Sequence, residues 1–154
     1  DISKNLSKNI ILKKLRSLNK NYRHLFKIKP KIGVLGLNPH NDEFKKKSEE
    51  KKIIFPSILK LKKEGINVNG PLVCDTIFIN EFKKYNVLVG MYHDQVLGPF
   101  KSLFKFDAIN ITLGLKYVRV SPDHGPATDL IGKNKGNYKS LLNCIKFINN
   151  LKRW

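Results

Sequence analysis

Lys31-Ile-Gly-Val-Leu-Gly-Leu37 is a short apolar run, the pattern of a strand that is buried on both faces. The run ends at Asn38-Pro39-His40, where the chain becomes polar. A second run of the same character, Asn86-Val-Leu-Val-Gly-Met91, ends at Tyr92-His93-Asp94-Gln95. The sequence therefore predicts two buried strands, each followed within a few residues by a histidine.

Working outward from these runs, the apolar periodicity predicts further elements on either side. We expect helices over 3–26, 48–64 and 138–151, strands over 108–113 and 117–120, and a turn at 69–71. The alternation of strands and helices favours an α/β fold with three α/β/α layers and a mostly parallel sheet. We expect residues 1–154 to form a single domain, with a closing helix that supplies Leu141, Leu142, Ile145 and Ile148 to its core.

The composition excludes several classes of protein. Hydrophobic residues make up 41% of the 154 residues and charged residues 27%, which is typical of a globular chain rather than a disordered one. No apolar run approaches the length of a transmembrane helix, so we expect no membrane partner. Cys74 and Cys144 are too few for a disulfide framework or a four-cysteine zinc site, and a cytoplasmic location is the expectation.

The net charge of +18 raises the question of a polyanionic partner. The 30 basic residues comprise 26 lysines and only 4 arginines, whereas nucleic-acid readers rely on the bidentate arginine side chain. We interpret the lysines as solvated charges, and we expect no nucleic-acid partner. A basic nucleic-acid-binding domain is the weaker alternative.

His40 and His93 come just after the two best predicted strands. Ligands of open α/β sheets gather at the carboxyl ends of the strands, so these two imidazoles could converge on one metal ion. Such a site needs a third ligand, for which Asp42, Asp94 and Asp123 offer oxygen atoms. The alternative is that the two histidines are unrelated loop residues.

Lys101, Asn110 and Arg119 follow on successive elements of one βαβ-like stretch. The two cations suit an anionic substrate, and an asparagine amide can bind a hydroxyl group. Arg119 lies in the apolar segment Tyr117-Val-Arg-Val120, where a buried charge would need a partner. An exposed edge strand, on which Arg119 needs no partner, is the alternative.

The loop from Asp123 to Lys133 contains two glycines, which expose backbone donors, and the carboxylate of Asp129. It is not a Rossmann fingerprint, because the chain has no G-x-G-x-x-G after a strand. A carboxylate in such a loop could bind a ribose diol, although loops of this composition are commonly simple turns.

Five strings together resemble the 4-hydroxythreonine-4-phosphate dehydrogenase family of pyridoxal phosphate biosynthesis. In chain order they are Gly36-Leu-Asn-Pro-His40, Asn69-Gly-Pro71 with Asp75-Thr76, Met91-Tyr-His-Asp-Gln95, Asn110-Ile-Thr-Leu-Gly114 and Asp123-His-Gly125. The loop after them also resembles the adenosine-binding loop of the isocitrate and isopropylmalate dehydrogenase group, which implies that fold. The resemblance covers nearly the whole chain.

The resemblance implies an NAD- or NADP-dependent oxidation of 4-phosphooxy-L-threonine, with decarboxylation to 3-amino-2-oxopropyl phosphate. It also implies a divalent metal ion (zinc, magnesium or cobalt), a small phosphorylated substrate and a homodimer. The residues that match the family's functional positions are His40 and His93 for the metal, Lys101, Asn110 and Arg119 for the substrate, Lys101 and Asp94 for catalysis, and His124, Gly125 and Asp129 for the cofactor.

Two departures from the family pattern bear on this hypothesis. Members are about twice as long, so the chain resembles their C-terminal half and lacks the third metal histidine and an upstream His-Thr pair. The segment Asn41-Asp-Glu-Phe-Lys-Lys-Lys47 lacks the glycines that many members carry there. We therefore expect a fragment with weak activity or none alone. A non-catalytic module that binds substrate or nucleotide is the alternative.

Overall fold

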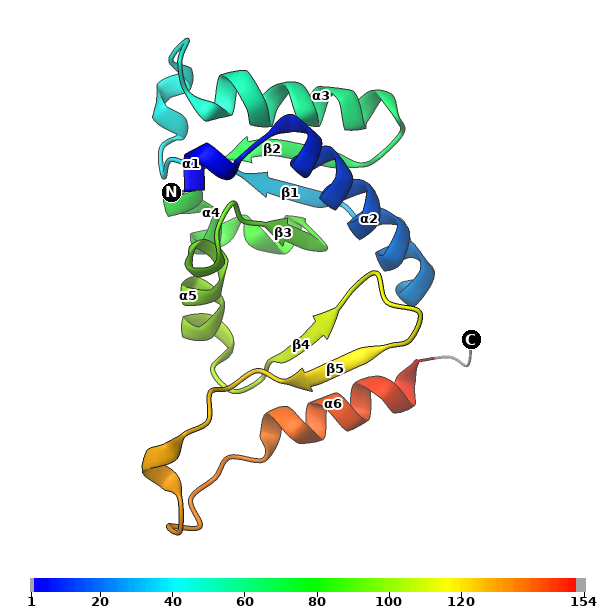
Figure 1. The fold of residues 1–154 in the computed structure, drawn as a ribbon, viewed down its shortest axis with the longest axis vertical. Coiled ribbons are helices and arrows are strands. Elements are labelled where there is room, and N and C mark those ends of the chain that lie inside the picture. Colours follow the sequence, from blue (N-terminus) through cyan, green and yellow to red (C-terminus); the bar gives the residue numbers. More distant parts are fainter. Residues whose placement is uncertain (1, 152–154) are drawn as a thin grey trace. The chain divides into compact units, whose positions relative to one another are not determined.

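The computed structural model describes residues 2–151, which form two compact units with the division after Pro99 (Figure 1). Each unit has its own sheet and its own packed helices, and each is described by itself. The predicted single domain over residues 1–154 stays a prediction.

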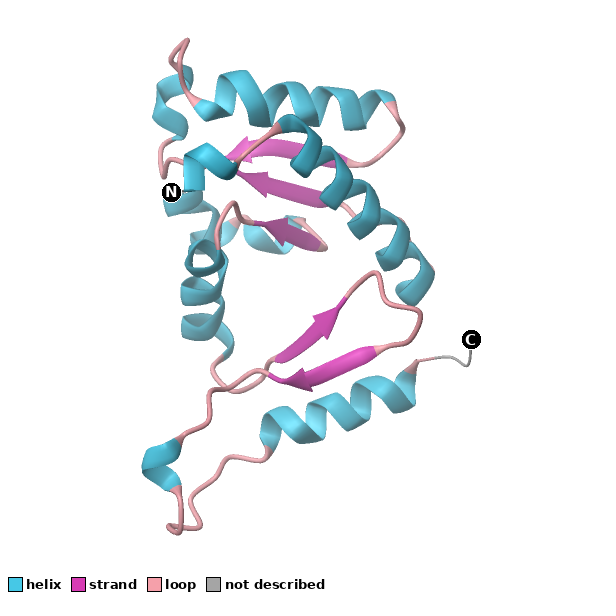
Figure 2. Cartoon of the chain, viewed as in Figure 1, coloured by secondary structure: helices cyan, strands magenta, loops and turns pink. Residues whose placement is uncertain are grey.

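Unit 1, residues 1–99, contains three strands and most of the helices (Figure 2). Its strands are β1 (Ile32–Leu35), β2 (Val68–Leu72) and β3 (Val87–Val89). Its helices are α1 (Ile2–Asn5), α2 (Lys8–Phe26), α3 (Phe55–Lys63) and α4 (Cys74–Asn80), with short turns of helix at Asn41–Phe44, Glu50–Ile54 and Phe82–Lys84. Helix α5 (His93–Phe104) begins in this unit and extends past the division.

The three strands form one parallel sheet in the order β2-β1-β3. All four residues of β1 are buried, as its uninterrupted apolar run predicts for a central strand. Register pairs Ile32 with Val87 and Val34 with Val89, so β1 and β3 end side by side. The predicted α/β class with a parallel sheet is confirmed.

Helices α2 and α3 pack together over one face of this sheet, as Figure 1 shows. Ser7 starts α2 by accepting a hydrogen bond from the Ile10 amide at 3.3 Å. The buried core comprises Ile11, Leu12, Leu15, Ile32, Val34, Ile54, Ile58, Leu61 and Val68. Because Leu15 is only 2% exposed, its truncation to alanine would cost about 2–5 kcal/mol.

Residues 69–71 are the clearest local departure from the sequence prediction. They continue β2 instead of forming a turn, with an irregularity in register opposite β1. Gly70 has φ +140°, and a Cβ atom there would lie 2.3 Å from the backbone oxygen of Val34. The turn prediction was wrong because this Gly permits a close approach of two strands rather than a reversal of the chain.

Unit 2, residues 100–154, contains β4 (Ile109–Thr112), β5 (Arg119–Pro122), a short helical turn at Thr128–Leu130 and α6 (Lys139–Asn150). Both predicted strands are present, but they pair with each other in antiparallel fashion and do not add to a parallel sheet. The reason is the short connection between them, since a parallel crossover needs about a dozen residues or more.

Helix α6 packs on β4 and β5 through its more polar side. Ser140 is buried, where its Oγ donates to the backbone oxygen of Ala108 and accepts from the Asp123 amide at 2.9 Å. The apolar residues predicted to enter a core, Leu141, Leu142, Ile145 and Ile148, are instead 37–52% exposed. The hairpin covers only the side of α6 that carries Ser140 and Cys144, so the opposite, apolar side stays exposed within the described residues.

Candidate functional site

His40 follows the carboxyl end of β1 and contacts a carboxylate from the neighbouring strand's connection. Its Nε2 atom lies 2.7 Å from Oδ2 of Asp75, in the first turn of α4, which follows β2. The Cys74 amide also donates to the backbone oxygen of Pro39 at 3.0 Å. The chain after β1 is therefore joined to the chain after β2 by two adjacent contacts.

Two polar side chains hold the turn that carries His40. Glu50 is fully buried, and its Oε1 accepts hydrogen bonds from the Leu37 and Asn38 amides, both at 2.8 Å. Asn38 Oδ1 in turn accepts from the His40 amide at 2.9 Å and from the Asp42 amide at 3.2 Å. These bonds satisfy backbone donors that no helix or strand uses.

His93 is the first residue of α5 and follows the carboxyl end of β3. Its Nδ1 lies 2.6 Å from Oδ1 of Asp94, and both side chains are well exposed. Because β1 and β3 are adjacent and parallel, both histidines follow the same edge of the sheet. Their predicted placement beyond the strand ends is what the structure shows.

A complete metal site is not present among residues 2–151, where no three His, Cys, Asp or Glu side chains are grouped to hold an ion. Of the oxygen donors considered from sequence, Asp42 contacts Lys45 at 3.1 Å and Asp94 contacts His93. Sharing of one ion by His40 and His93 stays a prediction. Asp75 is a functional candidate that the sequence did not predict, although an acidic residue just after a strand is a usable signal.

In unit 2, Lys101 forms an ion pair with Asp123. The Lys101 Nζ lies 2.7 Å from Oδ2 of Asp123 and also donates to the backbone oxygen of the same residue. The two side chains are 34% and 21% exposed, so the pair is half-buried. Asp123 therefore serves as the counter-ion of Lys101, a role that the sequence did not predict.

Asn110 and Arg119 lie on one face of the β4–β5 hairpin. Asn110 stands opposite Ser121 and Thr112 opposite Arg119, and alternation along each strand places all four side chains on one face. Arg119 is exposed, and its Nη1 donates to Thr112 Oγ1 at 3.0 Å. This exposure agrees with the alternative in which Arg119 needs no buried partner, and its guanidinium can still meet an anion from solvent.

The loop predicted to bind the cofactor is exposed along most of its length. His124 Nδ1 lies 3.0 Å from the Gly125 backbone oxygen, and Asp129 lies in the short helical turn Thr128–Leu130. Ala127 has the left-handed φ of 46° just before this turn. The assignment of His124, Gly125 and Asp129 to a cofactor stays a prediction.

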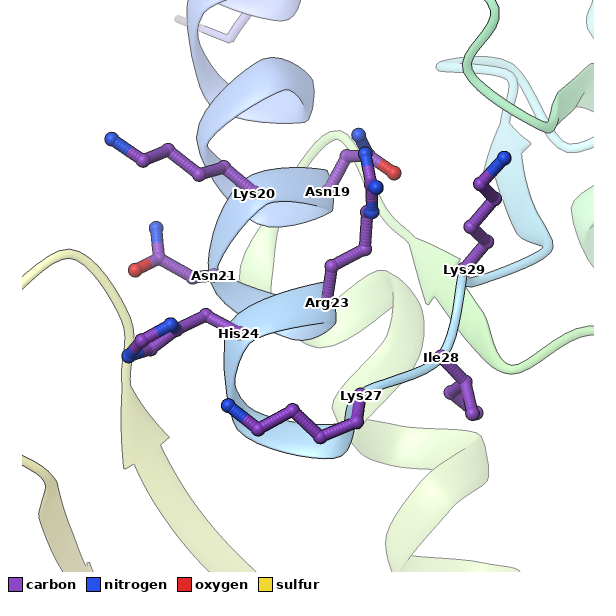
Figure 3. Close-up of a pocket in the computed structure, with 8 residues that line it drawn as sticks. All are labelled: Asn19, Lys20, Asn21, Arg23, His24, Lys27, Ile28 and Lys29. Carbon is purple, nitrogen blue, oxygen red and sulfur yellow. The ribbon is translucent and has the colours of Figure 1, made fainter. Parts of the chain in front are cut away.

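A cavity of about 740 Å³ lies elsewhere in unit 1, at the end of α2 (Figure 3). It is lined by Asn19, Lys20, Asn21, Arg23, His24, Lys27, Ile28 and Lys29. The charges would suit an anion. The lining residues come before β1 in the chain, however, whereas His40 and His93 come after the ends of β1 and β3. It contains none of the predicted site residues and is not the candidate site.

Comparisons with known proteins agree with the sequence resemblance. A family described as pyridoxal phosphate biosynthetic protein PdxA matches residues 1–148. The 4-hydroxythreonine-4-phosphate dehydrogenase of Aquifex aeolicus is 45% identical over 98% of this chain and 47% of its own length. That of Sulfurihydrogenibium is 42% identical over 99% of this chain and 48% of its own length.

Solved structures give the same result. The crystal structure of a 4-hydroxythreonine-4-phosphate dehydrogenase from Burkholderia phymatum matches with a TM-score of 0.78 and 31% identity, over 99% of this chain and 48% of that one. The enzyme of the same name from Klebsiella pneumoniae matches with a TM-score of 0.79. The chain thus spans about half the length of the relatives it matches. Within residues 2–151, none of the helices combines the length and apolarity needed to cross a membrane.

Proposed function

The chain belongs to the family of pyridoxal phosphate biosynthetic protein PdxA, and from this premise we propose that it is part of an NAD- or NADP-dependent dehydrogenase acting on 4-phosphooxy-L-threonine. The secondary hydroxyl would be oxidised to a ketone, and the resulting β-keto acid would lose CO2 to give 3-amino-2-oxopropyl phosphate. The observation that carries the proposal is the near-complete match of this chain to dehydrogenases of that name.

The residues at the strand ends fit a divalent metal ion. His40 and His93 supply imidazole nitrogens, which suit zinc or cobalt, and each ring has one nitrogen against a carboxylate and one nitrogen left for a ligand. A third ligand would come from outside the described residues. When bound, such an ion would polarise the substrate hydroxyl and the carbonyl that replaces it.

The substrate's negative charges would be met by the cations of unit 2. Arg119 offers an exposed guanidinium, and Asn110 on the same face offers an amide that can bind a hydroxyl or carbonyl oxygen. Lys101 Nζ, half-buried against Asp123, would hold a proton close to the reacting oxygen and donate to it as charge develops. Asp94 would act by orienting His93.

The nicotinamide cofactor would accept the hydride, and the exposed loop of unit 2 would bind its adenosine end. Asp129 is the residue suited to a ribose diol, with His124 and Gly125 beside the same ligand. We also infer a homodimer in the cytoplasm without a nucleic-acid partner, in keeping with the resemblance.

A non-catalytic module that binds substrate or nucleotide is the second candidate. The observation behind it is that residues 2–151 contain no group of three His, Cys, Asp or Glu side chains that could hold an ion. The two candidates differ in turnover, because a binding module would shift in thermal stability with ligand and yet form no reduced cofactor.

The test is an assay of the full-length gene product with 4-phosphooxy-L-threonine and NAD or NADP, followed by the absorbance of reduced nicotinamide. We expect turnover that is lost on chelation and restored by a divalent ion. His40→Ala and His93→Ala should each lower kcat by at least about 100-fold, because a metal contributes several kcal/mol to the transition state. Ligand-induced stabilisation without turnover would favour the binding module.

A further inference from the structure

Gln95 is a buried polar residue at the edge of the sheet, and nothing in the proposed chemistry uses it. The residue is 5% exposed and lies in the first turn of α5, two residues after His93. Burial of an amide is costly unless both of its ends are hydrogen-bonded. The contacts of this side chain therefore indicate what it does.

Both ends of the Gln95 amide bind backbone groups of different strand ends. Its Nε2 donates to the backbone oxygen of Gly36 at 2.6 Å, just after β1. Its Oε1 accepts from the Met91 amide at 2.7 Å, just after β3. The orientation of the amide is fixed, because a peptide oxygen can only accept and a peptide N–H can only donate.

The Gln95 side chain thus joins the chains that follow β1 and β3, beyond the point where the backbone hydrogen bonds between these strands end. The last registered pair of β1 and β3 is Val34 with Val89, and beyond it each chain continues toward its histidine. The Gly36 amide donates to Leu72 of β2 at 3.0 Å, so Gly36 is fixed to β2 on one side and to Gln95 on the other.

We call the two hydrogen bonds of the Gln95 amide the Gln95 bridge, and Gly90 is packed closely against it. A Cβ atom on Gly90 would lie 3.2 Å from Gln95 Oε1 and 2.9 Å from a methyl carbon of Val96. The glycine after β3 therefore allows the amide to reach the Met91 N–H. Movement of the Gln95 side chain would break both of its hydrogen bonds to the backbone.

We propose that Gln95 is a positioning residue that fixes the spacing of the His40 and His93 segments, so that both imidazoles can bind one divalent ion. His40 lies four residues after Gly36 and His93 two residues after Met91, so each histidine is a short step from one end of the bridge. The inference rests on the proposed function for the ion, but the bridge itself is a property of this chain.

The test compares Gln95→Met with the wild type in the full-length gene product, using Co2+ alone as the probe and its visible absorption as the readout. Methionine keeps the length and volume of the side chain and removes both hydrogen bonds. Outer-shell partners of metal ligands contribute about 10–100-fold in affinity. We expect Gln95→Met to weaken Co2+ binding by about that factor and to alter the absorption spectrum.

Ser57→Ala is the matched control for stability alone. Ser57 is also buried, and its Oγ donates to the Ile53 backbone oxygen at 2.7 Å, within one helical segment and not between two strand ends. The control should lower Tm without changing Co2+ affinity. Gln95→Glu should not rescue binding, because its carboxylate would face the Gly36 oxygen without a donor.

The outcomes distinguish failure of the positioning role of Gln95 from failure of the proposed function. Equal Co2+ affinity and spectrum in Gln95→Met and wild type would overturn the positioning role and leave the proposed function intact. Failure of the wild type itself to bind Co2+ would overturn the metal site of the proposed function. In the metal-free protein, faster hydrogen exchange of the Met91 amide in Gln95→Met than in Ser57→Ala would support the bridge, and equal exchange would contradict it.

Discussion

Nε2 of His40 lies 2.7 Å from Oδ2 of Asp75, although one residue follows β1 and the other follows β2. The contact forms because adjacent parallel strands deliver their following segments to one edge of the sheet. It gives His40 a carboxylate partner of the kind that commonly orients metal-binding imidazoles.

Asp75→Asn is expected to weaken divalent metal binding by about 10-fold or more, because the amide cannot polarise the imidazole as a carboxylate does. Calorimetric titration of the full-length protein with Zn2+ measures the effect. Glu81→Gln is the control, since Glu81 pairs with Lys84 on the surface at 2.7 Å. Equal affinities in Asp75→Asn and the control would show that the contact does not serve the ion.

Arg119→Ala should mainly raise the KM for the phosphorylated substrate, because the anion loses a charge-assisted hydrogen bond. The expected loss in kcat/KM is about 10- to 100-fold, from about 1.5–3 kcal/mol for such a bond. Arg119 is exposed, so Tm should stay nearly unchanged. An unchanged kcat/KM would refute the assignment, and Arg119→Lys should retain part of the affinity.

The Arg16–Glu64 pair predicts a pH dependence of stability. Arg16 donates two hydrogen bonds to the Glu64 carboxylate, at 2.8 and 2.6 Å, and holds the pKa of Glu64 below its ordinary value. A lowered folded-state pKa means that the stabilisation is present above the unfolded pKa of about 4.3 and is lost as pH falls through the folded pKa.

The difference in Tm between wild type and Glu64→Gln should therefore be present at neutral pH and be lost as the pH falls through the lowered folded-state pKa of Glu64. Thermal melts at a series of pH values measure it. The effect should be small, because the Arg16 and Glu64 side chains are 45% and 33% exposed and solvent screens the pair. A difference that persists unchanged in acid would show that the pair contributes by packing alone.

The sequence predicted those parts of the fold that are set by local pattern. The two apolar runs predicted β1 and β3. Because each run ends shortly before a histidine, the sequence also predicted that His40 and His93 follow the strand ends. The partners of site residues were not predictable in the same way, because Asp75 on His40 and Asp123 on Lys101 depend on tertiary placement. The exposure of the apolar side of α6 was not predicted, because the spacing of apolar residues shows that a helix has an apolar face but not which element covers that face.

Hydrogen exchange should be slowest in β1 and at least about 10-fold faster in β4. Ile32, Val34 and Leu35 are fully buried, and β1 is hydrogen-bonded to a strand on each side. Within the described residues, β4 pairs with β5 alone, and a two-stranded hairpin is marginal without further packing. Mass spectrometry of deuterated peptides from this chain distinguishes the two, and equal protection would contradict the expectation.

Residues 1–154 expressed alone are expected to show little or no dehydrogenase activity. The chain corresponds to 47–48% of its relatives, and residues 2–151 hold no group of three side chains for an ion. Two imidazoles alone should bind a divalent ion more weakly than a complete site, and positioning of the hydroxyl against the nicotinamide would suffer as well. Reduced cofactor formed from 4-phosphooxy-L-threonine at a rate near that of the Aquifex aeolicus enzyme would contradict this expectation. A cooperative melt together with negligible turnover would show that residues 1–154 hold their fold but not the full chemistry.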